Sequence, residues 1–116
     1  MTNKKELANT VTYSDRRLKN CIRPLDVTTK IDEIRPVRYN RHDLQIHEFG
    51  FIAQEVKEIF PEVVIENEET GLLSLDYGKL SAVAIQAAKD NKSKIEEQQV
   101  QIDELRAMIK ALSGNT

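Results

Sequence analysis

The stretch at residues 49–64 reads FGFIAQEVKEIFPEVV and places apolar side chains at spacings of one, three and four. These side chains are Phe51, Ile52, Val56, Ile59 and Phe60. The spacing predicts an amphipathic helix of about two to three turns, because residues three and four apart share a helix face. Gly50 precedes this helix and Pro61 closes it.

Strand signals lie on both sides of this helix. Downstream, residues 63–77 read VVIENEETGLLSLDY, with β-branched and apolar residues around a polar NEETG turn, which predicts a hairpin. Upstream, VRYNR at residues 37–41 predicts a strand. The following RHDLQIHEF, residues 41–49, fits either a strand or a loop.

A second, shorter helix is predicted before the first strand. Residues 25–37 read LDVTTKIDEIRPV, in which Val27, Ile31 and Ile34 have helical spacing. Asp26 is placed as its N-cap, and Pro36 stops the helix soon after Ile34.

The chain after Tyr77 predicts one long helix. It contains no proline as far as Gly114, a suitable C-cap, and is rich in Ala, Gln, Glu, Lys and Leu. With Ile95 at heptad position a, a seam of a and d residues runs along this helix. Its members are Ala84, Ala88, Asn91, Ile95, Gln98, Ile102, Leu105, Ile109 and Leu112.

This seam persists after the globular pattern has ended, so its apolar residues lack an obvious partner within the chain. We therefore expect the helix to associate with copies of itself, the alternative being an amphipathic helix packed on its own domain. Ile at a with Leu at d favours two parallel strands, but Ala layers and polar d residues weaken that rule. The heptad alone leaves the choice between dimer and trimer open.

Composition limits the remaining possibilities. The chain has 116 residues, 5% aromatic residues, no Trp and a net charge of −2. We expect one domain with a thin aliphatic core, no nucleic-acid or membrane partner, and synthesis in the cytosol without a signal peptide. No metal-ligand spacing, carboxylate pair or phosphate loop occurs, so no metal or cofactor is expected. Cys21 is the single cysteine and is expected to be a buried structural thiol.

The segment SDRRLKNCI, residues 14–22, is open to three interpretations. Ser14 is a helix cap beside a solvated basic face, the cations together with Arg23 form a phosphate-binding patch, or Lys19 activates Ser14 as a nucleophile. Five residues turn an α-helix by about 140° beyond a full turn, so Ser14 and Lys19 would not share a helix face. The pair requires Ser14 to lie in an extended or turn segment. The acidic net charge and the lack of interleaved aromatic residues argue against the phosphate patch.

Four blocks in this order resemble the intramolecular chaperone auto-processing domain. They are YSDRRLKNCIRPL, IDEIRPVRYN, FGFIAQEVKEIFPEVV and LDYGKLSAVAIQAAKDNKSKIEEQ. This C-terminal module is found on endosialidase-type phage tailspikes and long tail fibres, and in a membrane-tethered animal transcription factor. The resemblance covers about residues 13–105.

The resemblance implies an α+β fold, in which a small mixed helix and hairpin domain precedes a long C-terminal helix that forms a homotrimeric coiled-coil-like bundle. Residues 1–13 would then be the stump of an upstream stalk, and residues 14–76 the chaperone and auto-processing core with protruding hairpins. Residues 77–113 would be the trimerisation helix and residues 114–116 a tail.

The resemblance also implies a function. Three copies associate, grip and fold the upstream β-rich stalk of the same polypeptide, and then act as a single-turnover serine peptidase that cuts between Tyr13 and Ser14. Ser14 would be the nucleophile and Lys19 the base. This assembly would take place in the host cytoplasm, with the fibre kept in the virion tail and the chaperone released. The alternative is a trimerisation and folding clamp that does not cleave, with Ser14 as a structural cap.

Further residues are candidates for supporting this site. Asp15 and Arg17 match the first block, Gln54 and Glu55 match the middle block, and His47 is kept because it lies close to Gly50 in sequence. Gln54 would orient the scissile amide or supply an oxyanion donor, although packing at the start of a helix is the alternative. His42 and His47 otherwise have the character of surface or packing residues.

Overall fold

Two antiparallel hairpins form the β-structure of the computed structural model, which describes residues 11–28 and 30–114. In the first, β1 (Val37–Arg41) pairs with β2 (Ile46–Gly50); in the second, β3 (Val64–Glu66) pairs with β4 (Leu73–Leu75). The predicted strand at VRYNR and the predicted hairpin at residues 63–77 are confirmed.

Helices connect and follow these hairpins. Between them lie α2 (Ala53–Ile59) and the 3-10 turn η3 (Pro61–Val63), and α3 (Tyr77–Gly114) follows β4. Two other 3-10 turns, η1 (Arg16–Leu18) and η2 (Ile31–Glu33), precede β1. The fold is therefore α+β, with the expected order of hairpins and a long C-terminal helix.

A small apolar core forms where α2 and η3 meet the first turns of α3. The buried residues are Val27, Val56, Ile59, Phe60, Val63, Leu80 and Val83. Val56 lies at its centre, with 2% of its surface exposed, and comes from the face that the spacing in residues 49–64 predicts. Pro61 has no N–H to continue the helical hydrogen bonds, so α2 ends and η3 begins there.

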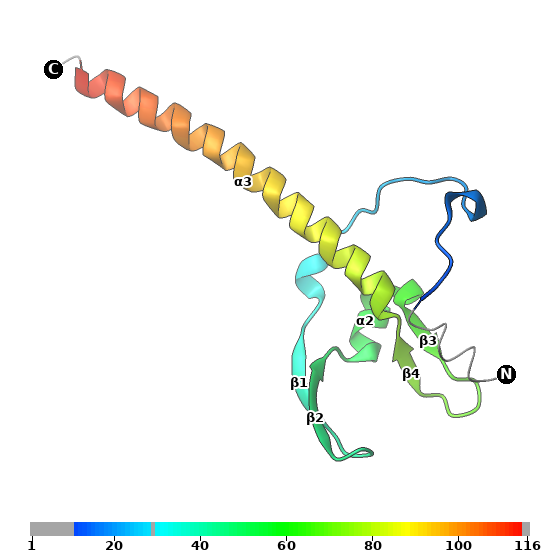
Figure 1. Ribbon diagram of the computed structural model, residues 1–116. Helices are drawn as coiled ribbons and strands as arrows, with labels where there is room; N and C mark the ends of the chain where they lie inside the picture. Colours follow the sequence, from blue (N-terminus) through cyan, green and yellow to red (C-terminus); the bar gives the residue numbers. More distant parts are fainter. Residues whose placement is uncertain (1–10, 29, 115–116) are drawn as a thin grey trace.

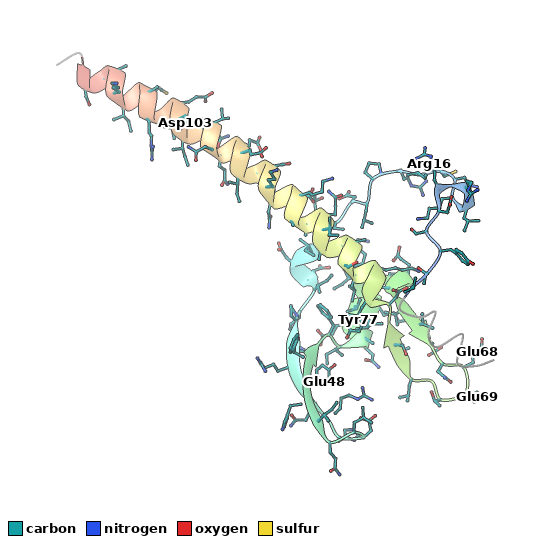
Figure 2. All side chains as sticks on the ribbon, viewed as in Figure 1. Arg16, Glu48, Glu68, Glu69, Tyr77 and Asp103 are labelled. Carbon is teal, nitrogen blue, oxygen red and sulfur yellow. The ribbon has the colours of Figure 1, made fainter. Side chains whose placement is uncertain are left out.

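The turn of the second hairpin is held by one side chain. Asn67 Oδ1 accepts hydrogen bonds from the backbone N–H groups of Glu69 (2.9 Å) and Thr70 (3.0 Å). Gly71 closes the turn with a φ of 73°, a conformation that glycine adopts without a steric penalty. Figure 2 shows Glu68 and Glu69 at this tip, far from the core.

The predicted helix at residues 25–37 is wrong. Asp26 makes the capping bond that was predicted, because its Oδ1 accepts the Thr28 backbone N–H at 3.1 Å and also the Thr28 hydroxyl at 2.8 Å. Only one turn follows, in which the Lys30 and Ile31 N–H groups donate to the Val27 carbonyl at 3.1 Å, and then η2. The apolar pattern still has its expected effect, because Val27 is buried and Ile31 and Ile34 pack against the core.

The long helix α3 begins at Tyr77, and the Asp76 carboxylate accepts a hydrogen bond from the Lys79 N–H at 3.1 Å. Only its first turns contribute to the core, through Leu80 and Val83. Figure 1 shows the rest of α3 projecting away from both hairpins, and the molecule measures 79 × 41 × 23 Å. Within the projecting part the seam residues Ile102 (42% exposed) and Leu112 (70% exposed) lie open to solvent in the single chain. The coiled-coil seam remains a prediction.

The N-terminal segment carries no strand within residues 11–13. The greater part of the stump predicted at residues 1–13, and residues 115–116 of the predicted tail, lie outside the described residues. Within residues 11–28 and 30–114, no helix has the length and apolar character needed to cross a membrane.

Core packing leads to a first prediction. Val56→Ala removes two methyl groups from the buried cluster and should lower the free energy of unfolding by about 2 kcal/mol. The same change at Val100, which is 57% exposed on α3, should cost less than about 0.5 kcal/mol. Urea titrations of both variants followed by circular dichroism provide the measurement, and equal losses would contradict this description of the core.

Candidate active site

Ser14 and Lys19 are in direct contact. The ammonium Nζ of Lys19 donates a hydrogen bond to Ser14 Oγ at 2.6 Å. Between them η1 closes a tight turn, in which the N–H groups of Leu18 and Lys19 each donate at 3.0 Å to the carbonyls of Asp15 and Arg16. Ser14 lies before this turn, in the non-helical conformation that the pair requires. Contact between the two side chains therefore needs no other copy of the chain.

Asp15, and not Ser14, is the N-cap of this turn. Its Oδ1 accepts the Arg17 backbone N–H at 2.8 Å. The Arg17 guanidinium returns to the same carboxylate, with Nε donating to Oδ1 at 3.1 Å and Nη2 to Oδ2 at 2.9 Å. These side-chain hydrogen bonds, and then the backbone one, hold the pKa of Asp15 below its usual value. The interpretation of Ser14 as a helix cap is therefore wrong.

The whole segment around the pair is open to water. Residues 11–26 are all exposed, and Tyr13, on the other side of the candidate scissile bond, is 94% exposed. Figures 1 and 2 show this segment, with Arg16, looping out from the rest of the molecule. Cys21 is exposed as well, with a φ of 51°, so its expected burial is wrong.

The other candidate supporting residues bind partners elsewhere. Glu55 accepts two hydrogen bonds from the Arg35 guanidinium, at 3.1 and 2.7 Å, which lower its pKa. His47 Nδ1 contacts Asn40 Oδ1 across the β1–β2 hairpin. Gln54 lines a groove of about 790 Å³ whose other walls come from β1, β4 and the start of α3. No hydrogen bond or ion pair among the described residues joins any of these three side chains to Ser14 or Lys19.

Three of the sequence blocks meet at the base of the hairpins instead, through Tyr39, through Gly50 and Phe51, and through Tyr77. A Cβ at Gly50 would lie 3.0 Å from the Tyr77 hydroxyl oxygen and 3.3 Å from that of Tyr39, so these phenols require a glycine or must move. Phe51 packs on Tyr77 with ring centroids 6.4 Å apart. The Tyr39 hydroxyl donates to Glu48 at 3.1 Å, and burial together with this bond raises the pKa of Tyr39. Figure 2 shows Tyr77 at this junction.

The comparison with protein families found a match that begins at the Ser14 turn. A family model described as chaperone of endosialidase, Peptidase_S74, matches residues 14–65. Residues 14–65, just under half of the chain, are therefore similar to the chaperone of endosialidase. The match begins at Ser14, includes η1 and both strands of the first hairpin, and ends in β3. A search of curated proteins found no relative of the chain.

Two contacts within residues 14–65 were not predicted from the sequence. Arg35 and Glu55 are 20 residues apart, and no local spacing signals their ion pair. Tyr39 and Glu48 are opposite each other in the β1–β2 register, so their hydrogen bond follows only once that hairpin is known. Among residues 11–28 and 30–114 no group of three or more His, Cys, Asp or Glu side chains is placed to hold a metal ion.

Exposure of the Ser14 turn allows a prediction about stability. Ser14→Ala and Lys19→Ala in the chaperone domain should each change the free energy of unfolding by less than about 0.5 kcal/mol, because neither side chain touches the core. Thermal unfolding followed by circular dichroism measures this, and a large loss in either variant would show that the pair supports the fold.

Proposed function

We propose that this chain is an intramolecular chaperone that trimerises through α3, folds the β-rich stalk of a phage tail fibre or tailspike that precedes it, and then cuts itself off. The cut falls between Tyr13 and Ser14. The chaperone role follows from the family of residues 14–65. The observation that carries the peptidase role is the 2.6 Å hydrogen bond between Lys19 and Ser14, beside the bond to be cut.

The chemistry requires a base and an intramolecular attack. Ser14 Oγ attacks the carbonyl carbon of Tyr13 through a five-membered ring, and its proton passes to the Lys19 amine. The C–N bond then breaks, the proton goes to the departing α-amine of Ser14, and an ester joins the Tyr13 carbonyl to Oγ. Water hydrolyses this ester. Proximity is supplied by the covalent chain, so the fold must add a base and stabilise the oxyanion.

Lys19 acts as a base only in its neutral form. Exclusion of water favours neutral amines, whereas the single chain leaves the pair exposed. We therefore propose that the pair is activated in the assembled state. There the stalk or neighbouring copies cover the turn and favour the neutral form of the Lys19 amine. Cleavage then takes place only when folding is complete. It also makes folding irreversible, because the fibre released from the chaperone can no longer unfold by the path along which it folded.

The projecting part of α3 supports the trimer. Its Ile and Leu seam residues are exposed in the single chain and repeat every seven residues, which is the pattern of helices that supercoil together. The hairpins support a grip on the stalk, since each two-stranded sheet leaves unpaired edges to which an extended segment can add. We place this assembly in the host cytoplasm, before the chaperone leaves the virion fibre.

Cleavage is tested by intact mass of the chain expressed behind about a hundred residues of its native stalk, a length that gives a β-rich segment of domain size. The parent should yield a fragment beginning at Ser14, while Ser14→Ala and Lys19→Ala stay whole and trimeric. If all three chains stay intact yet trimeric, the domain is a folding clamp without peptidase activity.

The trimer is tested separately by sedimentation equilibrium. Ile102→Asn places an amide in the proposed seam and should shift the chain toward monomer, because a polar group would be buried there. Val100→Asn makes a similar change at heptad position f, outside the seam, and should leave a trimer. Equal behaviour of the two variants would contradict the seam.

A further inference from the structure

The turn that carries Lys19 also offers it a competing partner. Asp15 is the N-cap and Lys19 the C-cap of η1. Four residues of 3-10 structure span only about 8 Å, a distance that a lysine side chain largely covers. Although four residues of a 3-10 turn lie about 120° apart around its axis, opposite charges this close in space attract each other. An unoccupied Asp15 would therefore attract Lys19 away from Ser14.

Arg17 occupies that carboxylate. Its guanidinium donates to both oxygens of Asp15, at 3.1 and 2.9 Å, in the bidentate geometry that arginine forms best. The backbone N–H of Arg17 adds a third hydrogen bond, at 2.8 Å. Lys19 is left to donate to Ser14 Oγ. Other described elements contribute no hydrogen bond or ion pair to this turn, so the charges that act on Lys19 come chiefly from Asp15, Arg16 and Arg17.

We propose that Arg17 is a positioning residue, which neutralises and occupies Asp15 so that the Lys19 amine stays on Ser14. This inference rests on the proposed self-cleavage. Asp15 caps the turn and is needed there as an acceptor, but its negative charge favours the protonated, inactive form of a nearby lysine. Arg17 lets the cap remain without that cost, which explains why an acidic cap and an arginine two residues later occur together.

The test measures the first-order cleavage rate of the stalk-bearing chain against pH. Arg17→Ala should slow cleavage about tenfold at neutral pH and move the pH of half-maximal rate upward by about one unit, as expected for an added nearby carboxylate. The double variant Asp15→Asn with Arg17→Ala keeps a capping side chain but no negative charge. It should recover a rate within about threefold of the parent and the parent's pH profile, since the group that captures Lys19 is gone.

Arg16→Ala is the matched control. It removes the same charge from the neighbouring residue of the turn, which makes no ion pair with Asp15. Because Asp15 stays occupied by Arg17, this variant should change the rate and the pH profile much less than Arg17→Ala does. All variants should remain trimeric with the parent's thermal stability, because no residue of the turn belongs to the apolar core or to the proposed seam of α3.

Two outcomes would overturn the inference while leaving the peptidase role intact. In one, Arg17→Ala cleaves like the parent. In the other, the double variant is as slow as Arg17→Ala, which would mean that Arg17 only braces the turn. A parent chain that does not cleave at all would instead remove the proposed peptidase function, and this inference with it.

Discussion

The packing of the first turns of α3 on α2 and η3 is the contact on which the other elements depend. Leu80 and Val83 close the cluster around Val56, and Val27 ties the N-terminal segment to it. A two-stranded hairpin is at best marginally stable alone, so both hairpins rely on their attachment at this cluster. Because the core is small, the strand edges and most of α3 stay exposed. These exposed surfaces can bind another copy of the chain or another segment of the same chain.

The candidate site residues predicted from the sequence would suggest one continuous site, but their contacts fall into two groups. Gly50, Phe51 and Tyr77 pack together at the base of the hairpins, where they determine the fold. The turn from Ser14 to Lys19 is held only by its own hydrogen bonds. Stability and the proposed chemistry therefore reside in separate parts of the chain, so substitutions in the turn can be interpreted without a folding defect.

Sequence patterns predicted the elements whose signals are local and repetitive. The apolar spacing around Val56 predicted α2, and the absence of proline together with the many helix-favouring residues after Tyr77 predicted α3. At residues 25–37 the cap at Asp26 was predicted, but the helix is limited to one turn and η2, because β-branched residues such as Thr28 favour a helix less than the apolar spacing alone suggests. For Ser14 and Lys19, the spacing showed that they would not share a helix face, but it could not predict the turn that brings them together. That turn depends on the hydrogen bonds between Asp15 and Arg17, which lie between Ser14 and Lys19 in the sequence. The Arg35–Glu55 pair depends on the tertiary fold alone.

The position of the Ser14 turn also restricts what assembly has to contribute to the proposed reaction. Lys19 already reaches Ser14 in one chain, so other copies are not needed to bring the two side chains together. However, hydrogen bonds and ion pairs in water contribute little stability, and an exposed turn held by them is ordered only part of the time. Covering the turn would strengthen these bonds, favour the neutral amine and exclude competing water. In the proposed reaction, the event that starts cleavage would therefore be burial of a pair already in contact, so a single chain would carry the complete pair and stay uncut until its stalk had folded.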